Sequence, residues 1–371
     1  MEARVLHYTI VVLVVLTVSV LFSSFSTMSK RSKKWYLLAS LGFLAFLTMF
    51  HGVEVGNDTA MYIDRFQSIA RTGDLFAYIK STTMEPGYLV FNYVLSRFTN
   101  NPQILFIASG LLVYSSLGLF LYRNCAAPGL AVFCVTTMQF FDMFLSGVRQ
   151  ALALAILLFA YSYIAKRKPV PFFLLVVLAA LFHYTALLFA IAYPAAVFSL
   201  NREGRHQALR VLLVIVCIVA VYVWFDTLLS VALALFPKYS YYIGSAAFAG
   251  EPNLAIILRT IVYLLMFLIP RWLLANEHRA REVDEGVARL SACNIILAAV
   301  SMNASVLGRL CMYFSPFSLV DYANNTNRLS REASVILTVL SLILLFFYGL
   351  TIVVFRMPAW YSTYPFSLCF F

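Results

Sequence analysis

The sequence predicts an all-α fold, a polytopic transmembrane helical bundle of about 12 spans. Two observations support this class. The chain of 371 residues is 62% hydrophobic and only 12% charged. Apolar runs of about 18 or more residues, long enough to cross the hydrocarbon core of a bilayer, recur from one end to the other. Because these runs leave no room for a sizeable soluble domain, residues 1–371 are predicted to form a single integral membrane domain.

The spans are assigned in chain order. The first apolar run, 5–26, is not followed by a convincing small-residue cleavage site, so we interpret it as an uncleaved span rather than a signal peptide. Segment 170–200 would be about 46 Å long as one helix, so we divide it at His183 into two short spans. The predicted spans are 5–26, 36–51, 102–122, 129–146, 149–165, 170–182, 184–200, 209–226, 256–276, 290–306, 309–323 and 333–355.

The basic residues predict the orientation of the spans. The segment Ser29–Lys34 carries four Lys or Arg residues, and such loops usually face the cytoplasm. Alternation from there places most other basic loops inside, and it places a major loop at 51–101 and a second loop at 226–255 outside. The net charge of +11 is therefore assigned to cytoplasmic loops and does not indicate a nucleic-acid partner.

The major outer loop is the most polar part of the chain. Within it, segment 86–98 begins with Pro86, a residue favoured at the first position of a helix, and is too short to span. We predict a re-entrant or interfacial helix there. Five of the sixteen acids of the chain lie between residues 51 and 102, namely Glu54, Asp58, Asp64, Asp74 and Glu85.

The predicted topology brings further polar residues to the outer ends of spans. They are Arg149 with Gln150, His183, and Arg309 with Tyr313. Polar and ionisable groups at membrane depth are costly and usually face a cavity or a partner. Simpler roles remain open for each candidate: a helix cap for Asp58, a turn start for Glu85, an interfacial position for Arg149, a hydrogen-bonded hairpin position for His183, and an ion pair for Arg309.

The sequence lacks the short motifs of familiar soluble enzymes. There is no phosphate-binding loop, dinucleotide-binding glycine pattern, zinc-protease motif or nucleophile elbow. No pair of histidines has metal-ligand spacing, so we expect chemistry without a metal or other cofactor, although a metal bridging Asp58, Glu85 and a phosphate stays open. The six cysteines are scattered, without a CxxC pair, and are interpreted as small apolar residues within helices.

Five short motifs follow one another in a fixed order along the chain. They are Gly56-Asn57-Asp58-Thr59 with Tyr62, Glu85-Pro86-Gly87-Tyr88, Ser146-Gly147-Val148-Arg149-Gln150, Phe182-His183-Tyr184-Thr185-Ala186, and Arg309 with Tyr313-Phe314. In this order they resemble the EpsG-like family of Wzy-type bacterial polysaccharide polymerases. The resemblance covers roughly residues 50 to 320, and the closing Tyr364-Pro365-Phe366 also looks like the end of that family. The second residue of the first motif varies within the family.

The resemblance implies an enzyme of the bacterial inner membrane. Such polymerases join undecaprenyl-pyrophosphate-linked oligosaccharide repeat units into O-antigen, capsule or exopolysaccharide on the outer face. The implied partners are these lipid-linked substrates, membrane lipids, and a chain-length regulator and a flippase of the same pathway. The acceptor hydroxyl needs a general base, and the leaving pyrophosphate needs cationic stabilisation.

We assign candidate roles on that basis. The base is Glu85 first and Asp58 second, and His183 either donates a hydrogen bond to the donor substrate or acts as the base itself. Pyrophosphate binding is assigned to Arg149 and Arg309. The remaining substrate-binding candidates are Gln150, Tyr62, Tyr88 and Tyr313.

Two other functions stay open. A flippase or transporter for lipid-linked sugars would show broken helices and charged residues at mid-membrane depth, and Asp142, near the outer end of a span, is the one such acid. An outer-face glycosyltransferase that uses a lipid monophosphate would show acids in the first outer loop, as Asp58 and Glu85 do.

Overall fold

The structure is a computed structural model that describes residues 1–197, 254–277, 285–302, 305–357 and 360–369, together with Trp224, Thr227, Ser230 and Val231. Within these ranges the regular elements are helices, and the one β feature is an isolated bridge between His51 and Leu368. The all-α class is therefore confirmed. The predicted span 209–226 and the second outer loop, 226–255, lie almost entirely outside the described residues.

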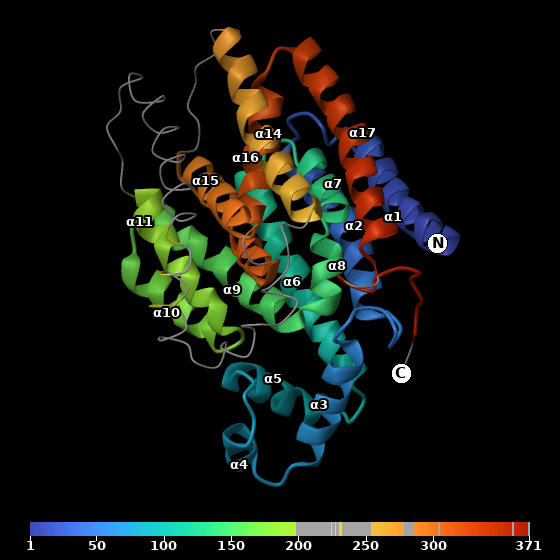
Figure 1. Cartoon of the computed structure of the whole chain (residues 1–371), viewed down its shortest axis with the longest axis vertical. Helices are drawn as coiled ribbons and strands as arrows, with labels where there is room; N and C mark the ends of the chain where they lie inside the picture. Colours follow the sequence, from blue (N-terminus) through green and yellow to red (C-terminus); the bar gives the residue numbers. More distant parts are fainter. Residues whose placement is uncertain are drawn as a thin grey trace. The chain divides into compact units, whose positions relative to one another are not determined.

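The chain forms two compact units, which we describe separately (Figure 1). Unit 1 comprises residues 1–190 and 326–371, and unit 2 comprises residues 191–325. The prediction of a single domain is not tested by this division. The helices of unit 1 are α1 Glu2–Leu21, α2 Lys30–Met49, α3 Thr59–Arg71, α4 Leu75–Lys80, α5 Pro86–Ser96, α6 Gln103–Asn124, α7 Gly129–Thr137, α8 Phe140–Ser146, α9 Val148–Ala165, α10 Pro169–Ala180, the 3-10 helix η1 Tyr184–Ile191, and α17 Arg331–Phe355.

Five described helices are long and apolar enough to cross a membrane, or six when one bent pair counts as a span. In unit 1 they are α1, α6, α9, α17 and the pair α7–α8; in unit 2 the candidate is α14. Helices α10 and 184–197 are apolar but shorter. The predicted total of about 12 spans is not confirmed, because several predicted spans are short helices or lie outside the described residues.

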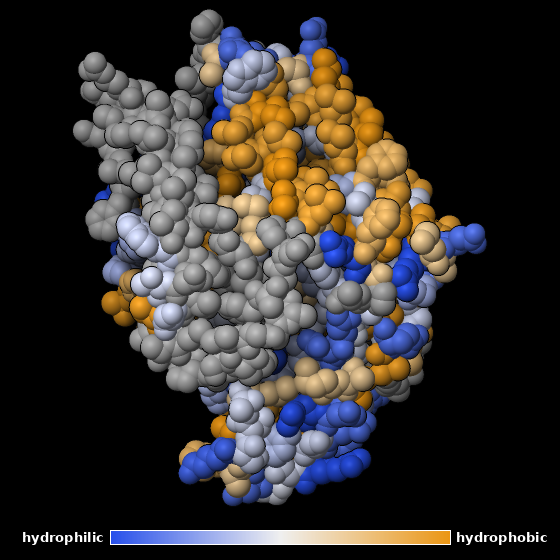
Figure 2. Space-filling model, in the orientation of Figure 1, coloured by the Kyte–Doolittle hydropathy of each residue, from blue (hydrophilic) through white to orange (hydrophobic). Residues whose placement is uncertain are grey.

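Local sequence explains where several of these helices begin. Ser29 and Ser330 cap α2 and α17, since each serine hydroxyl accepts a hydrogen bond from a backbone N–H three residues later. Helix α17 then presents an apolar face to its surroundings, which is orange in Figure 2, whereas the region of α3–α5 is mostly blue and white. This contrast is the one expected between a membrane-spanning helix and a polar loop of the same unit.

The predicted span 129–146 is not one continuous helix. It is broken into α7 and α8, which meet at an angle of 52°. Gln139 between them has a left-handed backbone conformation with φ of 60°, which a helix cannot contain. The hydroxyls of Thr136 and Thr137 both bond back to the carbonyl of Phe133, a contact that bends helices.

The predicted division at His183 is confirmed. Helix α10 ends at Ala180, and η1 begins at Tyr184. The predicted short helix in the polar loop is confirmed as α5, which begins at Pro86. The position of α5 relative to a bilayer stays a prediction.

The described part of unit 2 is also helical, and its largely apolar interior contains several buried polar side chains. Its elements are α11 Ala192–Val197, α14 Leu254–Asn276, α15 Glu285–Val300, the 3-10 helix η4 Ser305–Tyr313, and α16 Ser315–Arg328, whose last three residues belong to unit 1. The predicted span 309–323 is therefore interrupted at Phe314. Asn294 accepts a hydrogen bond from Ser315 and donates one to Ser318, so a buried polar network joins α15 to α16.

Candidate functional site

The carboxylate of Glu85 is the centre of a buried polar cluster in unit 1. Glu85 precedes α5 at the N-cap position, but its side chain makes no capping hydrogen bond. Instead, Arg149 Nη1 donates to Glu85 Oε2 at 2.5 Å, and the Glu85 side chain is only 2% exposed. The Glu85 carboxylate therefore binds Arg149 and does not cap the helix that it precedes.

Arg149 reaches this carboxylate from the first turn of α9. The helix begins at Val148, immediately after the Ser146-Gly147 junction with α8. The guanidinium also contacts the phenol of Tyr62. Its Nε atom is buried and has no hydrogen-bond partner among the described residues, while the side chain as a whole is 25% exposed. Arg149 is therefore anchored to Glu85 and retains hydrogen-bonding capacity for a further anionic group.

His183 approaches the opposite side of the same carboxylate. Its Nδ1 atom lies 3.6 Å from Glu85 Oε1, and the backbone N–H of Tyr184 points at the same oxygen from 3.5 Å. The His183 side chain is 15% exposed. Because the two ring nitrogens lie on opposite edges of imidazole, the Nε2 edge faces away from Glu85.

Gly87 allows α5 to dock on the turn that carries His183. An ideal Cβ atom at position 87 would lie 2.7 Å from the carbonyl oxygen of Leu181, closer than real Cβ contacts come. The next residue, Tyr88, donates its backbone N–H to that same carbonyl at 3.2 Å. The motif Glu85-Pro86-Gly87-Tyr88 thus supplies, in this order, the carboxylate of the cluster, the first residue of α5, and the glycine and backbone N–H that contact the carbonyl of Leu181.

Two of the predicted substrate-binding tyrosines, Tyr62 and Tyr88, pack against each other beside the Glu85 cluster, and we call this layer the floor of the cluster. Tyr62 and Tyr88 are almost fully buried, and their rings meet edge to face with centroids 5.8 Å apart. Burial raises the pKa of both phenols, so both stay protonated at neutral pH. They pack in an apolar core with residues of α6 and α9. Their position supports a role in holding Arg149, while direct contact with a sugar stays a prediction.

Asn92 also belongs to this floor, although no role was predicted for it from the sequence. It lies one turn after Tyr88 on α5, is fully buried, and donates from Nδ2 to the Tyr88 carbonyl at 2.8 Å. The Asn92 Oδ1 and Tyr88 Oη atoms are buried without a hydrogen-bond partner among the described residues. An asparagine one turn after the motif, in an otherwise apolar helix, was the available signal.

Asp58 occupies the N-cap position of α3, but its side chain makes no capping hydrogen bond. The structure therefore does not support a capping role for the Asp58 side chain. One turn later, the backbone N–H of Tyr62 donates to the Asp58 carbonyl at 2.9 Å. This bond connects residues 50–58, which we call the Asp58 loop, to the tyrosine that contacts Arg149. Whether the Asp58 carboxylate takes part in chemistry stays a prediction.

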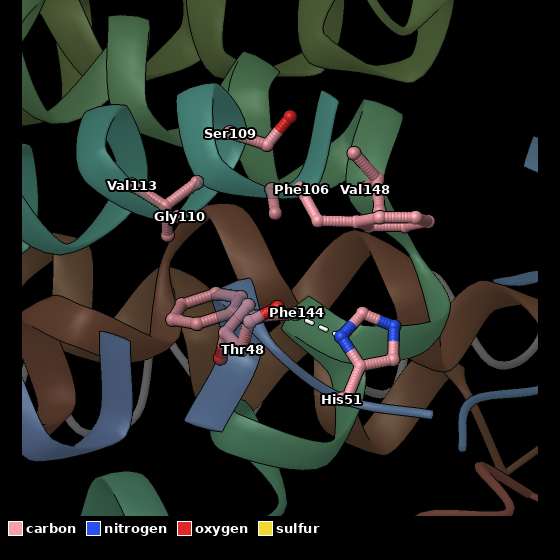
Figure 3. A pocket seen from close by; sticks show the side chains of 9 residues that line it. Thr48, His51, Phe106, Ser109, Gly110, Val113, Phe144 and Val148 are labelled. Atoms are coloured by element: carbon pink, nitrogen blue, oxygen red, sulfur yellow. Dashed lines mark hydrogen bonds between the residues drawn. The ribbon is translucent and has the colours of Figure 1, made fainter. Parts of the chain in front are cut away.

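His51 supports this loop from inside the bundle (Figure 3). Its Nδ1–H donates to the Thr48 carbonyl at 2.7 Å, and its Nε2 lies 3.3 Å from the hydroxyl of Thr59, the first residue of α3. The ring packs edge to face on Phe106 beside a cavity of about 10 Å³, which is about the room that one water molecule needs. Burial lowers the pKa of His51 to about 4.

We expect this buried histidine to make stability depend on pH. The folded pKa of about 4 lies below the ordinary value near 6.5, so protons bind the unfolded chain more readily, and stability falls as pH falls from about 6.5 towards 4. For His51→Asn, which keeps an N–H donor, the melting temperature in detergent should fall less over this range, and the difference should correspond to roughly 2 kcal/mol by pH 5. Parallel curves for wild type and His51→Asn would contradict the assignment.

The remaining candidates lie beside the cluster or in unit 2. Gln150 is buried next to Arg149 on α9. Arg309 is exposed and Tyr313 is buried, and both lie in η4 of unit 2. Since the two units are described separately, the convergence of Arg309 and Tyr313 with Glu85 stays a prediction.

Unit 2 contains a second buried ion pair that the sequence analysis missed. Arg271 on α14 makes a bidentate contact with Asp321 on α16, with both N–O distances at 2.8 Å. The guanidinium also lies over the ring of Phe267, 3.7 Å from its centroid. A bidentate pair between two helices fixes their register. The signal was an arginine inside an apolar helix and an aspartate within an apolar stretch.

The apolar helices indicate a membrane protein, and in unit 1 it carries a partly exposed cluster of Arg149, Glu85 and His183 around a buried carboxylate. A family model confirms the suspected family: the EpsG family model matches residues 34–368 of the 371, and the chain belongs to the EpsG family. This family indicates a membrane protein of polysaccharide biosynthesis and is associated with glycosyltransferase-like polysaccharide polymerases. No curated protein and no solved structure matches the chain.

Proposed function

We propose that this protein is a polysaccharide polymerase that joins lipid-linked oligosaccharide repeat units on the outer face of the bacterial inner membrane. The observation that supports this best is the cluster of Arg149, Glu85 and His183. An arginine, a carboxylate and an imidazole are brought together from α9, the start of α5 and the turn after α10. These residue types meet the two needs of glycosyl transfer, a cation for the leaving group and a proton acceptor.

In the proposed reaction, a hydroxyl of the incoming lipid-linked unit attacks the anomeric carbon of the growing chain. The bond from that carbon to the pyrophosphate oxygen breaks, and undecaprenyl pyrophosphate leaves with the electron pair. Arg149, already anchored by Glu85, offers its remaining N–H groups to this anion. The proton of the attacking hydroxyl passes to the base.

The geometry favours His183 as the base, with Glu85 orienting its imidazole ring. Glu85 is enclosed, with Oε2 on Arg149 and Oε1 facing His183 and the Tyr184 N–H. His183 is the more exposed of the two side chains. With Nδ1–H directed at Glu85, its Nε2 would take the proton, in the arrangement in which a carboxylate orients a histidine base. Catalytic contacts are often loose without substrate, which suits the separation of 3.6 Å. Glu85 acting directly as the base remains the other assignment.

Several finer features belong to this proposal. They are the total of about 12 spans, which the apolar runs predict; the outward orientation of the polar loop, which the basic residues predict; Arg309 as a second pyrophosphate ligand; and cooperation with a flippase and a chain-length regulator. The repeat unit is proposed to be that of an O-antigen, capsule or exopolysaccharide. No cofactor takes part in the proposed reaction.

One observation favours a second function, transport of lipid-linked sugars. The broken pair α7–α8 carries Asp142, which is 1% exposed, and its Oδ1 atom has no hydrogen-bond partner among the described residues. Broken helices with a buried acid are typical of transporters. Deletion of the gene distinguishes transport from polymerisation.

Deletion of the gene is the experiment that tests the proposal. We expect the deletion strain to carry surface glycan limited to one repeat unit, seen as the loss of the ladder on a gel, while lipid-linked repeat units persist. Plasmid-borne wild-type protein should restore the ladder. A strain without even the single repeat unit at the surface would indicate a transporter instead.

A further inference from the structure

A single serine hydroxyl joins three segments that are far apart in the sequence. Ser146, the last residue of α8, donates its Oγ–H to the carbonyl of Tyr361 at 2.8 Å. The same Oγ accepts the backbone N–H of Asn57 at 3.2 Å. Ser146 is 6% exposed, so both contacts are shielded from water. The proposed function assigned no role to this residue, although it belongs to the motif that carries Arg149.

The C-terminal segment, residues 360–369, continues this contact along the Asp58 loop (Figure 1). The Asn57 side chain donates to the Trp360 carbonyl at 3.0 Å, and the Gly56 N–H donates to the Ser362 carbonyl at 3.1 Å. Further along, the Gly52 N–H donates to the Ser367 carbonyl at 2.9 Å. The segment therefore binds the loop through its backbone at several points, while Ser146 fixes the end nearest to Asp58.

The loop also lies directly against the end of α8. Gly56 has a φ of +86°, a conformation that side chains rarely adopt. An ideal Cβ atom there would lie 2.9 Å from the carbonyl oxygen of Leu145 and 2.8 Å from the Thr59 hydroxyl. Glycine at position 56 therefore lets the loop approach the residue before Ser146 as closely as the two hydrogen bonds require.

These contacts join the loop that carries Asp58 to the end of α8, just before the helix that carries Arg149. Asp58 follows Asn57 directly, and Arg149 lies three residues after Ser146, in the first turn of α9. A shift of the loop relative to α8 would therefore move Asp58 relative to Arg149. Catalysis is sensitive to such shifts, since a displacement of about 1 Å can cost about 100-fold in rate.

We propose that Ser146 is a positioning residue: its hydroxyl, together with the C-terminal segment, holds the Asp58 loop in register with Arg149. The inference rests on the proposed function and on the further prediction that Asp58 takes part in the same reaction as Arg149. Ser146 itself does not touch the reacting atoms. Its removal should therefore change the turnover rate more than the binding of the substrate.

The test compares Ser146→Ala with Ser146→Thr, which keeps the hydroxyl, and with Ser116→Ala as the matched control. Ser116 also donates to a backbone carbonyl of another helix, that of Ala155 at 2.6 Å. Polymerisation by each purified protein would be measured with the lipid-linked repeat unit extracted from the deletion strain. We expect Ser146→Ala to lower kcat by about 10- to 100-fold with KM changed less than threefold, Ser146→Thr to recover most of the rate, and Ser116→Ala to match wild type.

Hydrogen–deuterium exchange supplies an independent readout of the contact. The Gly56 and Asn57 amides should exchange faster in Ser146→Ala and at the wild-type rate in Ser146→Thr and Ser116→Ala. If Ser146→Ala does not insert, Ser146→Cys, which keeps the volume and weakens both bonds, should show intermediate effects. Faster exchange with a normal kcat would overturn the positioning role, and unchanged exchange would overturn the contact itself. If Arg149→Ala also polymerises normally, the proposed function fails, while exchange still reports on the contact.

Discussion

Replacement of Arg149 by alanine is expected to abolish polymer formation while the protein still inserts into the membrane. The guanidinium of Arg149 binds the Glu85 carboxylate at 2.5 Å and is proposed to bind the leaving pyrophosphate. Loss of one electrostatic ligand of a developing charge typically costs about 100- to 1,000-fold in rate. Arg149→Lys should retain a small part of the activity, because lysine keeps the charge but loses the planar, bidentate geometry. Ladder length and turnover of extracted lipid-linked units measure the effect.

Stability must be separated from catalysis in this experiment. Arg149→Ala leaves the buried Glu85 carboxylate uncompensated, which by itself costs about 3–5 kcal/mol. The double variant Arg149→Ala with Glu85→Gln removes that charge, so its melting temperature should recover, whereas its activity should not. Arg97→Ala, at an exposed arginine that ends α5, is the matched control and should polymerise normally. Polysaccharide of normal length in Arg149→Ala would show that Arg149 does not take part in the reaction.

Glu85→Gln is the second change with a large expected effect. Glutamine keeps the size of the side chain but can neither accept a proton nor hold His183 and Arg149 by charge. A residue that only starts a turn would tolerate this exchange. We expect a loss of about 100- to 10,000-fold in polymerisation, with normal protein level and accumulated lipid-linked substrate. Asp58→Asn is the companion variant, and loss of polymer in Asp58→Asn alone would move the base to Asp58.

Chemical rescue distinguishes the two assignments for the base. If His183 takes the proton and Glu85 orients it, His183→Gly should be inactive and should regain turnover when imidazole is added, because the His183 side chain reaches the surface of the structure. If Glu85 takes the proton, formate should rescue Glu85→Gly and imidazole should not rescue His183→Gly. Normal polymerisation by both glycine variants would exclude the two residues together.

Much of the fold could be predicted because its signals are local. Apolar runs predicted α6, α9, α14 and α17, Pro86 predicted the start of α5, and excess length predicted the break at His183. The bend between α7 and α8 could not be predicted, since it depends on a left-handed Gln139 and on threonine contacts that an apolar run does not reveal. The interruption of the predicted span 309–323 at Phe314 was not predicted either.

The candidate site was predictable as a set of residues and not as an arrangement. Ionisable groups in an apolar chain attract notice one by one, which is why Glu85, Arg149 and His183 were found. Asn92, Ser146 and the ion pair of Arg271 with Asp321 were given no role, because an amide, a hydroxyl or a paired charge becomes informative only when its partner is known.

The sequence by itself determined the helical membrane class, the family and the residue types of the site, because hydropathy, charge and motif order are properties of the chain read in one dimension. Only the tertiary structure decided that Glu85 is enclosed between Arg149 and His183, that Asp58 does not cap its helix, and that the last residues of the chain bind the Asp58 loop. The physical reason is that a hydrogen bond between residues 57 and 146, or between 146 and 361, depends on how helices pack. No local pattern in the sequence encodes such a long-range distance.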